Sequence, residues 1–139
     1  MFIEEVDYKV VIGEIALTVV AQASPENRAN AEAEAIEEIS GYLRPKYDCS
    51  RIFAAEGPDR NRQLLMYACD IALYHMSSSL PSRMGMDIRR ERYEKALEWL
   101  KKVQDGTVLP DLPEALDEEG NSAAPTIRYG SQPCVDNSY

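Results

Sequence analysis

The segment from Ser24 to Pro45 constrains the fold of this chain most, because its sequence marks both ends of one long helix. Ser24 can accept a hydrogen bond from a free backbone N–H group at a helix start, and Pro25 suits the first helical position. The residues that follow are rich in alanine and glutamate, which are strong helix formers. Pro45 disfavours helical backbone in the residue before it. The sequence therefore predicts a helix over residues 25–43.

This helix is predicted to bury an apolar face. The residues expected on that face recur at helical spacing, and they are Ala29, Ala33, Ile36, Ile39 and Leu43. The glutamates expected to face solvent are Glu32, Glu34, Glu37 and Glu38. Glu34 and Glu38 lie one helical turn apart, so they could instead bind a metal or share a proton. Di-metal sites in helical bundles use Glu-x-x-His motifs, which this sequence lacks, so a solvated acidic face is expected.

A central helix is predicted next. The turn Gly57-Pro58-Asp59 opens it, with the aspartate as its cap, and Pro81 ends it. Its broad apolar stripe is typical of a buried helix and consists of Leu64, Leu65, Ala68, Cys69, Ile71, Ala72 and Met76. Asp70 lies within this helix, where an unpaired charge would be costly. We expect a salt bridge from Asp70 to Arg44 or Arg92, with a solvent-facing position as the alternative.

The last long helix is predicted to start at Met86 or Asp87 and to run to about Gln104. Gly106 follows where a left-handed C-terminal cap is wanted. Residues 46–57, between the first two long helices, are expected to form a connector that packs over them.

Residues 2–22 are predicted to form two short helices broken near Gly13. Their β-branched residues also allow a short strand from Ile15 to Val20. The apolar stretch from Val10 to Ala21 is too short to cross a bilayer, and the chain start has no signal-peptide pattern. Together, these segments predict an all-α fold, a small antiparallel bundle of about four helices with an extended C-terminal arm.

The composition changes at Pro110. Residues 110–139 contain four prolines and carry six acidic residues against one base, a charge of −5 out of the total of −9. We predict a helical domain over residues 1–109 and an acidic, extended or disordered arm over residues 110–139. The arm residues expected to anchor to a partner are Ile127, Arg128, Tyr129, Val135 and Tyr139. The alternative is a tail that binds nothing.

The sequence offers no recognisable catalytic, metal or cofactor site. His75 is the single histidine, so a packed or surface role is expected for it. The three cysteines are widely spaced and form no CxxC pair, which indicates reduced thiols. The formal charge of −9 disfavours plain nucleic-acid binding, which needs positive charge. The one basic stretch, residues 83–92, is diluted by Asp87 and Glu91.

Three segments together carry a resemblance to a known family. Residues 34–47 are similar to A-x-x-E-I-x-x-Y-L-x-x-R-Y, with Lys46 where arginine is common. Residues 65–74 are similar to D-I-A-x-Y, and residues 93–106 to Y-x-x-A-x-x-W-L-x-x-x-x-x-G. In this order and spacing, they resemble small phage head–tail connector proteins, the head-completion or adaptor family, of the Mu-like prophage type.

The resemblance implies a structural protein that forms an oligomeric ring under the portal of a tailed phage or prophage. DNA would pass through this ring without specific binding, and an acidic lumen that repels phosphate suits such a conduit. The implied partners are the portal protein, neighbouring copies of the chain and the next tail or stopper protein, with no membrane. The implied location is the head–tail junction of the virion, after synthesis in the bacterial cytoplasm.

The resemblance transfers no catalytic residue, metal or cofactor. The residues that it implies to pack or pair between helices are Tyr42, Asp70, Tyr74, Tyr93 and Trp99. Two other functions stay open at this point. One is a small cytosolic regulatory module for protein–protein interaction, and the other is a helical nucleotide pyrophosphohydrolase that uses clustered carboxylates and magnesium.

Overall fold

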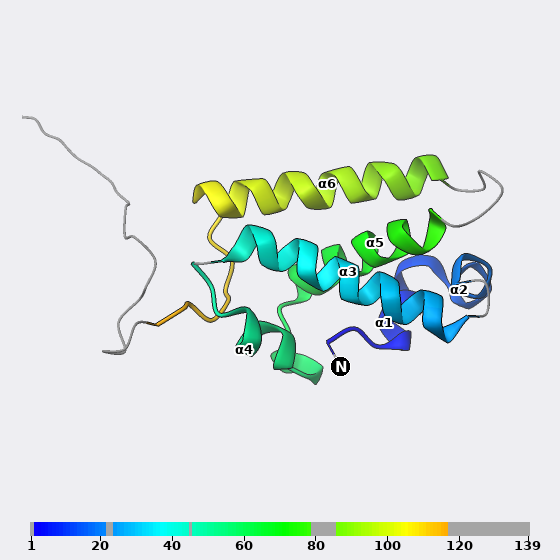
Figure 1. The fold of residues 1–139 in the computed structure, drawn as a ribbon, viewed down its shortest axis with the longest axis horizontal. Helices are drawn as coiled ribbons and strands as arrows, with labels where there is room; N and C mark the ends of the chain where they lie inside the picture. Colours follow the sequence, from blue (N-terminus) through cyan, green and yellow to red (C-terminus); the bar gives the residue numbers. More distant parts are fainter. Residues whose placement is uncertain (1, 22–23, 45, 79–85, 117–139) are drawn as a thin grey trace, which may run out of the picture.

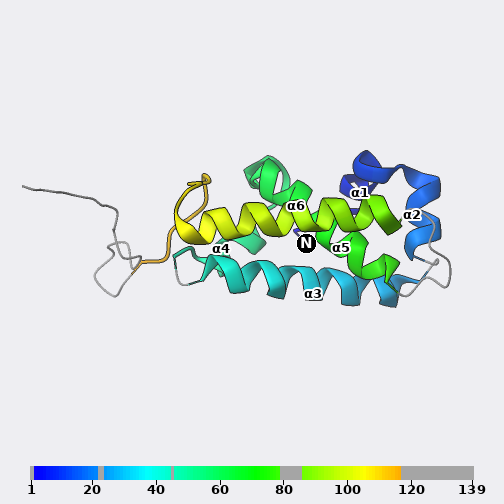
Figure 2. The ribbon, with the colours of Figure 1, turned by 90° about the horizontal axis from the view of Figure 1, so that it is seen from above.

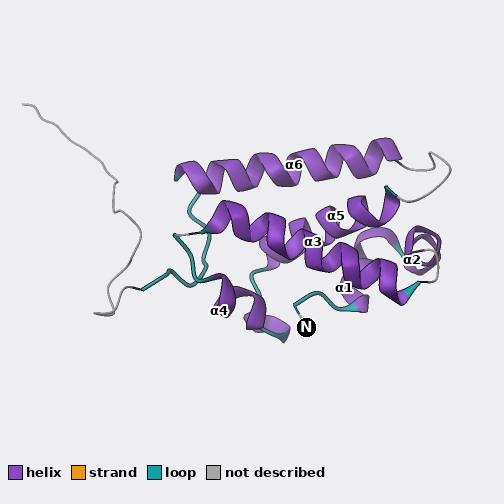
Figure 3. Ribbon diagram, in the orientation of Figure 1, coloured by secondary structure: helices purple, strands orange, loops and turns teal. Residues whose placement is uncertain are grey.

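The structure is a computed structural model that describes residues 2–21, 24–44, 46–78 and 86–116. The prediction of an all-α fold is confirmed: the described residues form helices and no strand, with one isolated β-bridge between Tyr47 and Glu114 (Figure 3). The elements are α1 (Glu5–Ile12), α2 (Glu14–Ala21), α3 (Pro25–Leu43), α4 (Cys49–Ala54), the 3₁₀ turn η1 (Gly57–Asp59), α5 (Arg62–Ser77) and α6 (Met86–Asp105).

Three long helices, α3, α5 and α6, contact one another and form the centre of the bundle. In Figure 1, α5 runs against the direction of both α3 and α6. The short helices α1 and α2 pack on α5, and their backbones do not approach that of α6. Figure 2, seen from above, shows α1 and α3 on opposite sides of α6. Helix α5 is therefore the central element, as its broad apolar stripe predicts.

Helix α3 has the predicted ends. The Asn27 N–H donates to Ser24 Oγ at 3.2 Å, and Arg44 is extended ahead of Pro45. The predicted buried face is partly wrong, since Ala29 and Ala33 are exposed. The buried residues of α3 are Ala31, Glu32, Ala35, Ile39, Ser40 and Leu43. Two of these residues, Glu32 and Ser40, are polar, and both form hydrogen bonds. The spacing of apolar residues alone therefore did not identify the buried face.

Helix α5 starts later than predicted. Gly57, with φ of 56°, opens only the turn η1, and Arg60 is extended after it. The cap of α5 is Asn61, whose Oδ1 accepts the Leu64 N–H at 2.9 Å. The prediction of Asp59 as the cap is therefore wrong. The predicted stripe is buried except for Leu65, which is half-buried, and Pro81 lies outside the described residues.

The last helix matches its prediction at both ends. At the end of α6, the Thr107 N–H donates to Lys102 O at 2.9 Å and the Gly106 N–H to Val103 O at 3.1 Å. Gly106 has φ of 85°, which a side chain would disfavour, and the two bonds form a Schellman cap. Lys46 Nζ also donates to Gln104 O at 3.1 Å, which places a cation at the negative end of the helix dipole.

The N-terminal region forms two short helices, and the prediction of a break at Gly13 is confirmed. Gly13 has φ of 82°, and its N–H donates to Lys9 O at 2.9 Å. The alternative of a strand from Ile15 to Val20 is wrong, because Glu14–Ala21 is helical.

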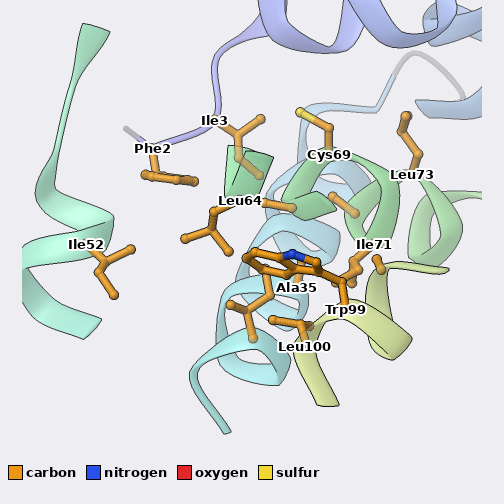
Figure 4. Close-up of a cluster of buried hydrophobic side chains, with 14 of the residues drawn as sticks. Phe2, Ile3, Ala35, Ile52, Leu64, Cys69, Ile71, Leu73, Trp99 and Leu100 are labelled. Atoms are coloured by element: carbon orange, nitrogen blue, oxygen red, sulfur yellow. The ribbon is translucent and has the colours of Figure 1, made fainter. Parts of the chain in front are cut away.

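The core continues beyond the three long helices to residues at the chain start and to α4 (Figure 4). Phe2 and Ile3 are buried, and the Phe2 ring meets Phe53 edge-on with centroids 5.0 Å apart. Ile52 of α4 is also buried. The predicted connector thus contains a helix that was not anticipated, although its apolar residues pack over the bundle as expected.

Residues 110–116, the first part of the predicted arm, lie against the helical domain. The Asp48 N–H donates to Pro113 O at 2.9 Å, and the Ala115 N–H donates to Lys46 O at 3.1 Å. Leu112 is buried. The rest of the predicted arm lies outside the described residues, so the division at residue 109 stays a prediction.

Candidate functional site

The deepest charged contact joins α5 to α6. Asp70 is 3% exposed within the apolar stripe of α5. Arg92 donates from Nε to Asp70 Oδ1 at 2.7 Å and from Nη2 to Oδ2 at 3.3 Å. The hydrogen bonds to this carboxylate raise the pKa of Arg92. The other predicted candidate, Arg44, lies at the end of α3 and pairs with Glu37 at 3.4 Å.

Two tyrosines stack across the same interface. The rings of Tyr74 in α5 and Tyr93 in α6 have centroids 4.1 Å apart and planes 9° from parallel. The Tyr93 hydroxyl donates to Glu38 Oε2 of α3 at 2.6 Å. Burial and this hydrogen bond to a carboxylate raise the pKa of Tyr93. One side chain of α6 therefore contacts both of the other long helices.

The single histidine lies beside this stack. His75 Nε2 is 3.0 Å from Glu38 Oε1, and its Nδ1 is 3.6 Å from Glu34 Oε2. We call Glu34, Glu38, His75 and Tyr93 the polar junction. The expectation of a solvated acidic face is wrong for Glu38, which is half-buried and bonded to α5 and α6. Of the two roles expected for His75, packed or surface, the structure shows the packed one. The nearest charged groups to its ring are the carboxylates of Glu34 and Glu38.

The two remaining residues predicted to pack differ in depth. Trp99 of α6 is buried in the core (Figure 4). Its ring tilts by 35° against Tyr67 of α5, with ring centroids 5.0 Å apart. Tyr42 of α3 packs against the core from a half-buried position. Asp70, Tyr74, Tyr93 and Trp99 thus all lie at contacts between α5 and α6.

A second set of polar contacts, not predicted from the sequence, fixes α1 to α3. The Tyr8 hydroxyl donates to Glu32 Oε1 at 2.8 Å, and Arg28 Nε lies 3.4 Å from the same oxygen. Burial, followed by the charge of Glu32, raises the pKa of Tyr8. Glu32 was expected to face solvent, and the structure corrects this, since it is buried. Its partner lies 24 residues away, so no local pattern marks the pair.

Arg60, just ahead of α5, holds the start of the chain. Its Nη1 donates to Phe2 O and to Asp7 Oδ2, each at 2.7 Å. The hydrogen bond to Asp7 raises the pKa of Arg60. Asp7 also accepts the Glu4 N–H at 2.7 Å, which caps α1. These contacts fix the orientation of α1 on the bundle.

Among the side chains of α1 and α2 that the structure describes, three large aliphatic ones face solvent. Val6 is 58% exposed, Val10 82% and Ile15 83%. We call these three residues the outer ridge. Val6 and Val10 lie one helical turn apart, so they share a face of α1. Rows of exposed apolar residues of this kind mark interaction sites more often than isolated ones do.

The described residues do not suggest metal or thiol chemistry. No three His, Cys, Asp or Glu side chains among them are placed to hold a metal ion together. Burial raises the pKa of the Cys69 thiol, which keeps this group protonated and unreactive. Within the described ranges, no helix combines the length and apolarity needed to cross a membrane.

The residues predicted to anchor the arm to a partner all lie outside the described residues. They are Ile127, Arg128, Tyr129, Val135 and Tyr139. Their role stays a prediction.

A family model described as bacteriophage Mu, Gp36 matches residues 9–128, which is most of the chain and includes all three long helices. No curated protein and no solved structure matches the chain.

Proposed function

Because the chain belongs to the bacteriophage Mu Gp36 family, we propose that it is a structural head–tail connector, or adaptor, of a Mu-like phage or prophage. In this role, copies of the chain form a ring under the portal, at the head–tail junction of the virion. DNA passes through the ring without specific binding. The partners are the portal protein, neighbouring copies and the next tail or stopper protein, and the chain catalyses no reaction.

The observation that carries this proposal is where the connector-like segments lie in the fold. Residues 34–47 include the end of α3, residues 65–74 lie in α5 and residues 93–106 lie in α6 and its cap. Side chains of these segments contact one another, since Tyr74 stacks on Tyr93 and the Trp99 ring packs on Tyr67. Side chains that pack against one another in this way stabilise the helical bundle and are not free to bind a substrate.

Charge and surface supply further support. The chain carries a net charge of −9, and a ring of such chains repels the phosphates of passing DNA. Exposed carboxylates along α3, such as Glu34 and Glu37, provide part of this charge on the folded surface. The outer ridge provides apolar area that a lone subunit leaves uncovered.

The test is cryo-electron microscopy of the full chain mixed with the portal complex of its own phage or prophage. We expect density for a symmetric ring bound under the portal. A portal from an unrelated phage serves as the control for specificity and should stay bare. If the matching portal also stays bare, while the protein remains a small free species at high concentration, the connector proposal is wrong. That outcome would favour a regulatory interaction module.

A further inference from the structure

Arg89 lies in the first half of α6, residues 86–95, and carries a buried donor that bonds to nothing. Among the described residues, its Nη1 is the only buried side-chain nitrogen or oxygen without a hydrogen-bond partner. A donor that has lost its water without gaining an acceptor costs stability, so such groups are rare in folded proteins. We therefore expect an acceptor inside the fold that this guanidinium can reach.

The carboxylate of Asp70 is the acceptor that lies close to Arg89. Burial lowers the pKa of Arg89, while the negative charge of Asp70 opposes this effect and the positive charge of Arg92 adds to it. Arg89 and Arg92 are three residues apart on α6, so they share a face of that helix. The three charged groups thus lie together in the interface between α5 and α6.

Asp70 can accept more hydrogen bonds than it receives. The two oxygens of an ionised carboxylate offer about four acceptor sites. Arg92 fills one on each oxygen, from Nε to Oδ1 at 2.7 Å and from Nη2 to Oδ2 at 3.3 Å. Asp70 is 3% exposed, so little water reaches the sites that remain. One buried interface therefore holds both an unpaired donor and unused acceptor sites.

The two arginines differ in how well water can reach them. The Arg92 side chain is 38% exposed, so water can solvate its guanidinium when it leaves Asp70. Water does not reach Arg89 Nη1. An exchange in which Arg89 bonds to Asp70 and Arg92 turns outward thus moves the unpaired donor from a buried position to a solvated one. This gain offsets the loss of the two bonds from Arg92.

The packing around these side chains leaves room for such an exchange. No residue from 87 to 95 is buried, so the first half of α6 has no interlocked apolar side chains that would oppose the rotation of Arg89 or Arg92. The second half, in contrast, is fixed by Ala96, Leu100 and Val103 in the core. The exchange would therefore be confined to the first half of the helix.

We propose that Arg89 is the reserve cation of Asp70, and that this interface exchanges between two arrangements. In one arrangement Arg92 holds the carboxylate, and in the other Arg89 holds it while Arg92 turns to water. Asp70 is paired in both, so the first half of α6 can adjust without leaving a buried charge uncompensated. The exchange takes place within a single chain and does not depend on the proposed ring.

The first test is thermal unfolding of the full chain at neutral pH, followed by circular dichroism. Arg89→Met and Arg92→Met each remove a cation but keep an aliphatic stem. Arg89→Met alone should shift Tm by less than about 2 °C, because Arg92 still holds Asp70. In the Arg92→Met background, the same change should lower Tm by at least about 6 °C, because Asp70 then has no cation.

Arg90→Met is the matched control for this test. Arg90 is the exposed neighbour of Arg89, and its ion pair with Asp87, at 4.0 Å, lies on the surface. Its replacement should shift Tm by less than about 2 °C in both backgrounds. A combined Arg89→Met and Arg92→Met variant that is unfolded at room temperature counts as the expected large loss, provided that Arg90→Met with Arg92→Met stays folded.

The second test is a crystal structure of Arg92→Met, with wild-type crystals from the same conditions as the reference. We expect the Arg89 guanidinium within hydrogen-bond distance of the Asp70 carboxylate. The proposal is wrong if Arg89 keeps its place and Asp70 has no cation, or if Arg89→Met shifts Tm equally in both backgrounds. Failure of Arg92→Met to fold would also overturn it, because a reserve cation should keep this variant folded.

Discussion

The two halves of α6 are held to the bundle by different kinds of contact. The second half, residues 96–105, buries Ala96, Trp99, Leu100 and Val103 in the core. In the first half, no residue from 87 to 95 is buried. That half is held by Arg92 on Asp70 and by Tyr93 on Glu38. The difference teaches that the apolar half supplies most of the stability, while the polar half sets the position of the helix.

The largest effect should come from the apolar half. Leu100→Ala removes a fully buried side chain, so the free energy of unfolding should fall by about 2–5 kcal/mol. The control, Ile88→Ala in the exposed part of the first half, should change it by less than about 0.5 kcal/mol. Urea unfolding followed by circular dichroism measures both. If both variants lost the same free energy of unfolding, the two halves of α6 would contribute equally to stability and the comparison would be wrong.

The next effect concerns the ion pair of the polar half. Asp70→Ala leaves Arg92 without its acceptor and should cost about 2–3 kcal/mol, below the range for a fully buried pair because Arg92 remains partly exposed. Replacing both residues, as Asp70→Ala with Arg92→Met, should cost less than the sum of the single changes. Strict additivity in this double-mutant cycle would show that the two side chains do not interact.

A smaller effect is expected at the polar junction. Tyr93→Phe removes the hydroxyl that donates to Glu38, which should cost about 1 kcal/mol at neutral pH. Tyr74→Phe keeps the ring stack and serves as the control, since the structure assigns no hydrogen bond to its hydroxyl among the described contacts. A Tyr74→Phe loss as large as that of Tyr93→Phe would contradict the assigned role of Glu38.

The same tyrosine predicts a pH dependence. Because the folded protein raises the pKa of Tyr93 above the ordinary value of about 10, folding favours the protonated phenol. The resulting stability is fully present below pH 10 and is lost as the pH rises above it. Tyr93→Phe should therefore flatten the alkaline decline in the free energy of unfolding. A residual decline should remain, because burial also raises the pKa of Tyr8.

The smallest effect should appear at the end of the apolar half. Lys46→Met keeps the aliphatic stem but removes the cation that donates to Gln104 O, and it should cost about 0.3–1 kcal/mol at low salt. The loss should shrink as salt is added, because the interaction is electrostatic. Lys101→Met, an exposed change on the same helix, should have no measurable effect. If the stability lost in Lys46→Met does not depend on the salt concentration, the contribution of Lys46 comes from packing and not from its charge.

The ends of the long helices could be predicted from sequence because their signals are local. Ser24-Pro25, Pro45 and Gly106 lie next to the backbone groups on which they act. The cap of α5 was misassigned because Asp59 and Asn61 are both good cap residues, and only the turn η1 decides between them. Helix α4 was missed because it is shorter than two turns and has no periodicity to detect.

The polar contacts show where sequence reasoning stops. Asp70 within an apolar stripe predicts that a cation must be near, but only the packing of α6 selects Arg92 over Arg44. Glu32 and Glu38 carry no such signal, because a glutamate on a helix rich in glutamate is expected to face water. Their burial depends on Tyr8, His75 and Tyr93, which come from distant parts of the chain.

The bridge between residues 46–48 and 113–115 also has a mechanical consequence. A pull on the chain beyond Leu116 first meets two backbone hydrogen bonds, from Asp48 N–H to Pro113 O and from Ala115 N–H to Lys46 O. Lys46 connects this bridge to both long helices. Its Nζ donates to Gln104 O at the end of α6, and its backbone lies shortly after Leu43, the last residue of α3. The load is therefore divided between two long helices, so tension on the C-terminal region does not peel α6 away from its own end.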